Sequence, residues 1–262
     1  MASFDKSISN QFDINDERLF KKTKKTILPS LSKPTDGPVS KYLNRPISNR
    51  ISKILVNYDI EPNHITIFSF IIGVLAVVLF YTGQYVWILV GGVLVQVSSI
   101  LDGCDGEIAR LKFKQSRFGA WFDKVLDRYA DGLIILGITH VVWLNVQSHW
   151  VLLIGFGALI GSFMTSYTAP EFDKILKKDL LLGIKHFRFG RDLRLFIIFV
   201  GAVFNQLFLT LMTLTLITNL ESIRRLIIFR NAFRFSHKYR KRNRTNYPKI
   251  EPTGRFSTRA QY

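Results

Sequence analysis

The sequence predicts an all-α integral membrane protein of six transmembrane helices, preceded by an amphipathic juxtamembrane helix. Two observations point to this fold class. Hydrophobic residues make up 48% of the 262 residues, yet the formal net charge is +17. The apolar residues fall in long blocks, and the Lys and Arg residues fall between and after these blocks, which is the pattern of a multi-span membrane protein with one basic side.

Composition also excludes some kinds of site. The chain has one cysteine, Cys104, so it can form neither an intrachain disulfide nor a thiolate-rich metal site. Residues 1–60 are polar and basic and lack the short apolar core of a signal peptide. We therefore expect the first span to act as its own insertion signal.

The chain divides into four regions by composition. Residues 1–32 predict a polar, basic cytosolic arm, and residues 33–60 an amphipathic surface helix. Residues 61–230 hold the six predicted spans, and residues 231–262 form a basic cytosolic tail.

The surface helix is predicted from apolar residues that recur at helical spacing, with Lys and Arg between them. These apolar residues are Val39, Tyr42, Leu43, Ile47, Ile51, Ile54 and Leu55. An ordinary core helix is the alternative interpretation. Pro46 predicts a kink or a break within the segment.

The first span follows a helix-start signal at Pro62 and Asn63. The six predicted spans are residues 65–81, 86–101, 118–144, 150–167, 195–204 and 207–228. The fifth is short unless Asp192 to Arg194 belong to its helix.

Orientation follows from the connections between spans. Those after the first, third and fifth spans carry no charge, whereas those after the second and fourth, and both chain ends, are basic. Because Lys and Arg concentrate on the cytoplasmic side, we expect a multi-pass cell-membrane protein with both termini cytosolic. The basic tail is also compatible with a nucleic-acid arm. Its position after a span favours anionic lipid headgroups, so we expect no nucleic-acid partner.

A group of acids beside these spans predicts the functional site. Asp102 and Asp105 share one helical face, and Asp123 and Asp127, four residues apart, share a face on the next helix. Placing a carboxylate within the membrane costs free energy, so such residues usually have a function. If two antiparallel helices bring these faces together, one or two divalent cations relieve the repulsion, and oxygen ligands favour Mg²⁺ or Mn²⁺.

Small residues and an arginine accompany the acids. Gly106, Ala109 and Gly119 leave room for a ligand to approach the backbone, and Arg110 can bind phosphate. Together these residues indicate a nucleotide-diphosphate site, in which two metals could clamp an in-line displacement. A solvated acidic face is the ordinary alternative. An intramembrane cation transporter is a functional alternative of another class, but it explains the acids without the Gly, Ala and Arg between them.

The stretch from Asp102 to Asp127 reads Asp-x2-Asp-Gly-x2-Ala-Arg-x8-Gly-x3-Asp-x3-Asp. It resembles the signature of the CDP-alcohol phosphotransferase family at every position, and the resemblance extends over residues 63–228. The resemblance implies a homodimeric membrane enzyme with two Mg²⁺ or Mn²⁺ ions per active site. In such enzymes a hydroxyl attacks the β-phosphorus of a CDP-alcohol, and CMP leaves.

The resemblance also implies roles for individual residues. The metal ligands would be Asp102, Asp105, Asp123 and Asp127, with Asp127 also the general base. The CDP pocket would comprise Asn63, Thr66, Gly106, Ala109, Arg110 and Gly119, because Pro62-Asn63 with Thr66 is similar to the Pro-Asn-x-x-Thr that opens the family's first span.

Residues outside the signature bear on the substrates. Lys33 to Ser40 and Asp127-Arg-Tyr-Ala-Asp131 resemble the membrane domain of di-myo-inositol-phosphate-phosphate synthases, which join CDP-inositol to inositol phosphate. We expect any CDP-inositol to come from a separate protein. Transferases with CDP-lipid donors, phosphatidyl- or archaetidyltransferases, are the alternative. Those usually carry an Arg-Ala-Arg-like run after Ser-Tyr in the fourth span, where this chain has Thr168-Ala169-Pro170.

A second basic group lies before the fifth span. Arg191 and Arg194 share a helical face there, and with Lys185 they are the predicted binding site for an acceptor phosphate. Arg188 could belong to the same group. For Lys185 and Arg188, positive-inside topology alone is an equal explanation. Asp131 continues the Asp123–Asp127 face and is expected to tune the site or to pair with a cation such as Arg128 or Arg110.

Overall fold

The computed structural model describes residues 37–181, 187 and 189–244, and for 176–181 and 231–244 it describes the backbone alone. The predicted basic arm, Lys185 and the end of the basic tail lie outside these residues. Everything regular in the described part is helical. The helices are α2 (Arg45–Leu55), α3 (Pro62–Tyr81), α4 (Tyr85–Leu111), α5 (Arg117–Val146), α6 (His149–Leu181), α7 (Arg191–Val203) and α8 (Leu207–Arg244).

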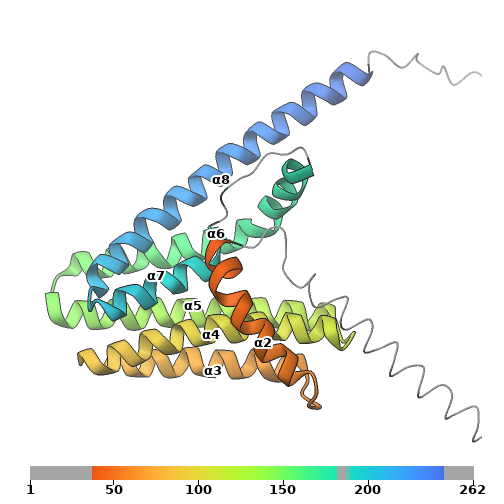
Figure 1. The fold of residues 1–262 in the computed structure, drawn as a ribbon. Coiled ribbons are helices and arrows are strands. Elements are labelled where there is room, and N and C mark those ends of the chain that lie inside the picture. Colours follow the sequence, from red (N-terminus) through yellow and green to blue (C-terminus); the bar gives the residue numbers. More distant parts are fainter. Residues whose placement is uncertain (1–36, 182–186, 188, 245–262) are drawn as a thin grey trace, which may run out of the picture.

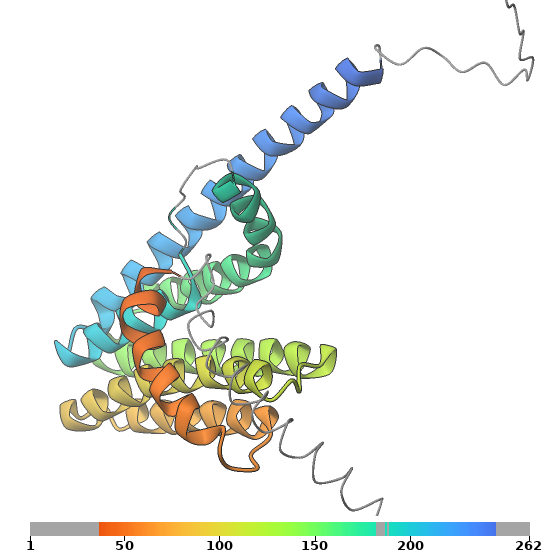
Figure 2. The same ribbon diagram turned by 45° about the vertical axis from the view of Figure 1, so that its right-hand side comes forward.

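The helices form one elongated bundle. Helices α3 to α7 run back and forth along it, while α8 crosses at an angle and extends beyond it (Figures 1 and 2). The connections α3–α4, α5–α6 and α7–α8, which carry no charge, lie at one end, opposite the basic α4–α5 connection (Figure 1). Each of the three uncharged turns contains a left-handed residue: Gly83, Gln147 or Asn205.

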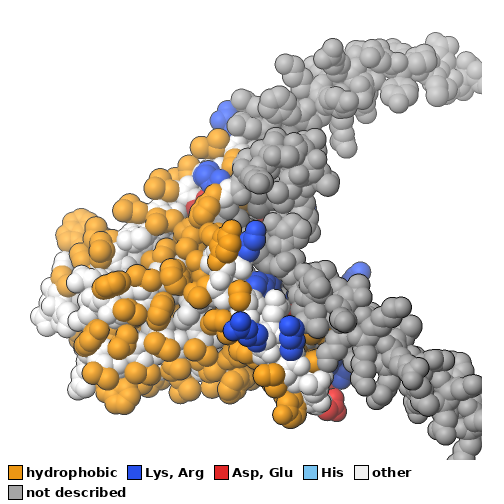
Figure 3. All heavy atoms as spheres, in the orientation of Figure 1, with side chains coloured by type: hydrophobic (Ala, Val, Ile, Leu, Met, Phe, Trp, Pro, Cys, Tyr) orange, Lys and Arg blue, Asp and Glu red, His pale blue; other side chains and the backbone are white. Residues whose placement is uncertain are grey.

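Apolar side chains lie on both the inside and the outside of the bundle. Its core contains, among others, Phe80, Ile138 and Leu214, all fully buried. The face seen in Figure 3 is also largely apolar, with Lys and Arg gathered toward one end. A bundle that exposes a broad apolar surface is suited to lipid surroundings rather than to water.

Four helices of the described part are long and apolar enough to cross a membrane: α3, α4, α5 and residues His149–Ile175 of α6. Helix α7 has 13 residues, about 20 Å of helix, which is less than the roughly 30 Å hydrocarbon core of a bilayer. It does begin at Arg191, so Asp192 to Arg194 lie inside it. The sixfold span count therefore stays a prediction.

Helix α2 is amphipathic, with its polar face packed against the protein and its apolar face exposed. Its polar Ser48 and Ser52 are buried against α4, while Tyr42, just before the helix, and Ile54 are 76% and 60% exposed. Pro46 is the second residue of α2, directly after a π-helical turn, Ser40–Asn44. The outward apolar face is compatible with the predicted surface helix, whose position at a membrane surface stays a prediction.

Helix α6 contains Pro170, which removes one backbone hydrogen bond within the helix. Beyond the main bundle, the C-terminal part of α6 bends away from its earlier course (Figures 1 and 2). Pro170 and Ala169 line a cavity at this bend. The bend thus opens space beside the predicted acids.

Candidate active site

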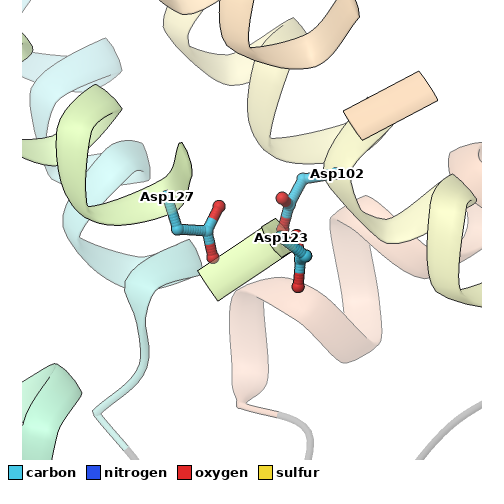
Figure 4. A group of neighbouring side chains, drawn as sticks. All are labelled: Asp102, Asp123 and Asp127. Carbon is cyan, nitrogen blue, oxygen red and sulfur yellow. The ribbon is translucent and has the colours of Figure 1, made fainter. Parts of the chain in front are cut away.

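Three of the four predicted metal ligands form a carboxylate cluster. Oxygen atoms of Asp102, from α4, and of Asp123 and Asp127, from α5, lie within 4.8 Å of one another. Figure 4 shows the three side chains converging from the two helices. Helices α4 and α5 both pack against α3 more extensively than against each other, so the carboxylates reach across the space between them.

Asp105, the fourth predicted ligand, lies beside this cluster. Its Oδ2 atom accepts a 2.6 Å hydrogen bond from Thr66 of α3, and its Oδ1 atom accepts one from the backbone amide of Gly106. Its charge lies close enough to Asp102 and Asp123 to interact with both. Asp105 thus lies next to the cluster and is held in place by Thr66, near the start of α3.

The cluster has the donor set of a hard-cation site. The Oδ1 atom of Asp123 is buried and has no hydrogen-bond partner among the described residues. A buried carboxylate oxygen without a partner is costly unless a cation or a proton satisfies it. The three converging carboxylates offer only oxygen ligands, which fit Mg²⁺ or Mn²⁺.

Two arginines of α7 border the cluster. The Nη1 atom of Arg191 lies 2.8 Å from Asp127 Oδ1 and 3.2 Å from Asp102 Oδ2. Its Nε atom lies 2.8 Å from Asp131 Oδ1, and Arg194 Nη2 lies 2.7 Å from the other oxygen of Asp131. The partners of Asp131 are therefore these two arginines, where the sequence had suggested a cation such as Arg128 or Arg110.

Arg194 is fixed from several sides. It also donates to the Ser162 carbonyl at 2.9 Å, to the Thr165 hydroxyl and to the Ser166 hydroxyl at 2.9 Å, all on α6. Only 4% of its side chain is exposed, against 14% for Arg191. Of the two predicted acceptor-site arginines, Arg191 is thus the more accessible one.

A polar cavity of about 580 Å³ opens beside the cluster. All three clustered carboxylates line it, together with Arg191 and Arg194. Its other walls include the π-helical turn Ser40–Asn44, α2, the bend of α6, the two residues before α7 and one residue of α8. We call it the reaction cavity below.

Arg225 is a cavity residue that sequence reasoning missed. This α8 side chain is 3% exposed and donates to the Phe189 carbonyl at 2.7 Å and the Thr165 carbonyl at 2.5 Å, while pairing with Glu221 at 2.7 Å. Phe189 comes two residues before Arg191, so Arg225 fixes the entry to α7. Its place in a long basic run concealed this role, because such a run looks like topology alone.

The predicted CDP residues lie outside the cavity lining, on the starts of α3 and α5 and the last turns of α4. Thr66 contacts Asp105. At Gly119, an added Cβ would lie 3.1 Å from Asn63 Oδ1, so these two residues are close neighbours. Gly106 lies near the Arg110 guanidinium, which an added Cβ would approach to 3.6 Å, and Ala109 is half-buried next to it.

Residues 60–220 match the CDP-alcohol phosphatidyltransferase family. The chain is 33% identical over 216 residues to the bifunctional IPC transferase and DIPP synthase of Aquifex aeolicus, which covers 80% of this chain and 48% of that protein. It is 35% identical over 156 residues to the archaetidylinositol phosphate synthase of Pyrococcus horikoshii, covering 60% of this chain and 76% of that one. The chain spans about half the length of the bifunctional relatives it matches.

The fold is also similar to that of the Mycobacterium tuberculosis phosphatidylinositol phosphate synthase. Its structure with CDP-DAG bound superposes with a TM-score of 0.55 at 23% identity, over 69% of this chain and 92% of that one. Its complex with manganese and citrate gives 0.53 at 23% identity, over 68% and 87%. The named relatives are transferases. With its residues 60–220 matched and the signature complete from Asp102 to Asp127, this chain belongs to the CDP-alcohol phosphatidyltransferase family.

Proposed function

We propose that this protein transfers a phosphoalcohol group from a CDP-alcohol to the hydroxyl of an acceptor alcohol and releases CMP, in a reaction that depends on Mg²⁺ or Mn²⁺. The observation that carries the proposal is the position of Arg191. It bridges the carboxylate cluster and the buried Asp131–Arg194 pair at the wall of the reaction cavity. A cation-binding acid cluster and a phosphate-binding guanidinium are thus adjacent.

The roles of the acids follow from their positions. Asp102, Asp123 and Asp127, with Asp105 beside them, would hold two divalent ions, which when bound neutralise charge on the diphosphate. Manganese in the related synthase supports this choice of metal. Asp127 lines the cavity and accepts the proton of the acceptor hydroxyl. The hydroxyl oxygen then bonds to the β-phosphorus, the bond from that phosphorus to the CMP oxygen breaks, and CMP leaves with the electron pair.

The two substrates would occupy different sides of the carboxylates. The CDP moiety would bind along Asn63, Thr66, Gly106, Ala109, Arg110 and Gly119. CDP-DAG bound to the related synthase supports a cytidine nucleotide in this fold. The acceptor would bind in the reaction cavity, which those six residues do not line.

We propose a phosphorylated acceptor, bound by Arg191, Arg194 and Lys185. Arg191 is the residue best placed for contact, because it lines the cavity and is partly exposed. Arg194 supports it through their shared partner, Asp131. Lys185 lies outside the described residues, and its part in the proposal rests on the sequence.

The proposed substrate pair is CDP-inositol and inositol phosphate. Similarity to the bifunctional IPC transferase and DIPP synthases supports it. A CDP-lipid donor with a polar alcohol is supported equally well, by similarity to the archaetidylinositol phosphate synthase and by the CDP-DAG complex of the mycobacterial enzyme.

A substrate panel tests the proposal. Purified protein in Mg²⁺ would be given CDP-inositol or a CDP-lipid, each with inositol phosphate, inositol, glycerol phosphate or serine, and CMP release would be measured. We expect CMP with CDP-inositol and inositol phosphate. CMP with CDP-lipid donors alone would select the alternative. No CMP with any pair, alongside metal flux in proteoliposomes, would favour a transporter and refute the enzyme assignment.

We further propose a homodimer in the cell membrane, with both termini cytosolic and the four-region division given by composition. The basic α4–α5 connection lies opposite the three uncharged connections, which supports one basic, cytosolic side (Figure 1). Accessibility of terminal tags to protease in intact cells and in inverted vesicles would test the orientation. Tags cleaved from outside intact cells would contradict it.

A further inference from the structure

Glu107 is a fully buried carboxylate in the acidic stretch. The proposed reaction gives this residue no role. Its Oε1 atom lies 2.7 Å from Arg45 Nη1 and accepts a 2.7 Å hydrogen bond from Ser48, and its Oε2 atom accepts one of 2.7 Å from Ser52. All three partners belong to α2. A buried charge with three well-formed partners fixes their positions, because losing any of them would leave part of the charge unsatisfied.

The segment that contains α2 is held at two further places. Asn44 donates to Ser99 at 3.1 Å and accepts from Gln96 at 2.8 Å, deeper along α4. The backbone amide of Ser40 donates to Asp192 at 2.8 Å, one residue after Arg191. Residues 40–52 therefore extend from the entry of α7, along α4, to Glu107, and we call them the α2 strap.

The α2 strap is also a wall of the reaction cavity. Ser40, Asn44, Arg45 and Ser48 all line it. The strap approaches α4 closely next to the metal cluster: at Gly103, which follows Asp102, an added Cβ would lie 3.5 Å from Ser48 Oγ. The cavity is thus bounded on one side by Arg191 and on another by the strap.

We propose that the α2 strap forms the acceptor side of the reaction cavity and that Glu107 is the residue that positions it. This inference rests on the proposed function, because the acceptor is assigned to the cavity. The acceptor is favoured over the donor because the strap is tied to Asp192 beside Arg191, whereas the predicted CDP residues lie outside the cavity lining. Glu107 acts through Arg45 and Ser48, which border the acceptor, and does not itself line the cavity.

Glu107→Gln tests the positioning role, since it keeps the side-chain shape and removes the charge that holds the strap. We expect the KM for the phosphorylated acceptor to rise about tenfold, with the donor KM and kcat changed far less. Glu107→Asp, which keeps the charge, should restore part of the acceptor affinity. Arg50→Ala is the matched control, because Arg50 is an exposed arginine on the same helix. Equal effects on donor and acceptor KM, or none on either, would overturn the proposal.

Thermal unfolding of each variant separates this role from simple stabilisation. A Glu107 variant that unfolds earlier but keeps its acceptor KM would make Glu107 a stabilising residue only, which contradicts the proposal. Ser52→Ala is useful here, because Ser52 bonds to Glu107 but does not line the cavity. We expect Ser52→Ala to lower the unfolding temperature and to change the acceptor KM little.

A second experiment does not need turnover. In a Cys104→Ala background, Ser40→Cys would be treated with a maleimide reagent, with and without inositol phosphate and with inorganic phosphate. We expect either phosphate compound to slow labelling at Ser40→Cys. Labelling at Lys53→Cys, an exposed position one residue beyond the strap, should be unaffected. Unchanged labelling at Ser40→Cys would refute an acceptor-side strap. Protection without CMP release from any substrate pair would instead refute the proposed reaction and retain the phosphate-binding wall.

Discussion

Arg194 and Asp131 form a buried ion pair between α7 and α5, with Nη2 and Oδ2 2.7 Å apart and side-chain exposures of 4% and 3%. The other oxygen of Asp131 pairs with Arg191 at 2.8 Å. Asp131 lies one helical turn after Asp127, which also contacts Arg191. One carboxylate therefore fixes both arginines relative to the proposed base.

Asp131→Asn should destabilise the protein and displace Arg191. The substitution leaves two guanidinium groups near an amide in place of a charge, and breaking a buried ion pair costs about 3–5 kcal/mol. We expect a clearly lower unfolding temperature in detergent and a higher acceptor KM. Asp59→Asn, at an exposed acid, should change neither. Wild-type stability for Asp131→Asn would show that the pair does not hold α7 in place.

Asp127→Asn should abolish turnover while leaving nucleotide binding largely intact. The amide keeps the size of the side chain but cannot take the proton of the acceptor hydroxyl. CMP release and CMP binding, measured on the same preparation, separate the two effects. Substantial residual CMP release would remove Asp127 from the role of base.

The sequence predicted those parts of the site that depend on the spacing of residues within one helix. Three- and four-residue spacing predicted that Asp102 and Asp105 share one helix face and that Asp123 and Asp127 share another. In the structure Asp102, Asp123 and Asp127 converge, and Asp105 lies beside them. The Asp131–Arg194 pair joins residues 63 positions apart, and no local pattern encodes which buried acid meets which base. Helix α2 was predicted from its apolar period, but the period did not show that its serines, rather than its isoleucines, face Glu107.

Asp123→Ala should weaken divalent-metal binding. It removes the carboxylate whose buried Oδ1 atom has no partner among the described residues. The Kd for Mn²⁺ would be measured by electron paramagnetic resonance. Losing a residue that only supports a metal ligand typically weakens metal binding roughly ten- to hundredfold, so losing a direct ligand should raise the Kd at least as much. Chelation should likewise lower the unfolding temperature of the wild type but not of this variant. Glu61→Gln, at an exposed acid, serves as the control, and unaltered Mn²⁺ affinity in Asp123→Ala would place the ion elsewhere.

Arg191→Ala should raise the KM for a phosphorylated acceptor. A hydrogen bond to a charged group contributes about 1.5–3 kcal/mol, which corresponds to a roughly ten- to hundredfold rise. Arg191→Lys should recover little of it, because an ammonium cannot bridge Asp127, Asp131 and a phosphate with a planar fork. Arg230→Ala, at an exposed arginine of α8, should behave as wild type. An unchanged acceptor KM in Arg191→Ala would restrict Arg191 to its ion pairs with Asp102, Asp127 and Asp131.

Gly106→Ala distinguishes a glycine kept for a ligand from one kept for packing. An added Cβ at Gly106 would meet nothing closer than Arg110 Nη1 at 3.6 Å, an ordinary contact, so the protein itself has room for alanine. Alanine also favours the helix by about 0.5–1 kcal/mol over glycine, and thermal stability should be equal or higher. If the nucleotide approaches this backbone, the same methyl group will raise the donor KM and weaken CMP binding, with the acceptor KM nearly unchanged. Gly73→Ala is the matched control, because its added Cβ would also make ordinary contacts, 3.5 Å from Ser98 Oγ and 3.8 Å from Ala130 Cβ. A wild-type donor KM in Gly106→Ala would remove Gly106 from the CDP pocket, because a nucleotide bound against this backbone would meet the added methyl group.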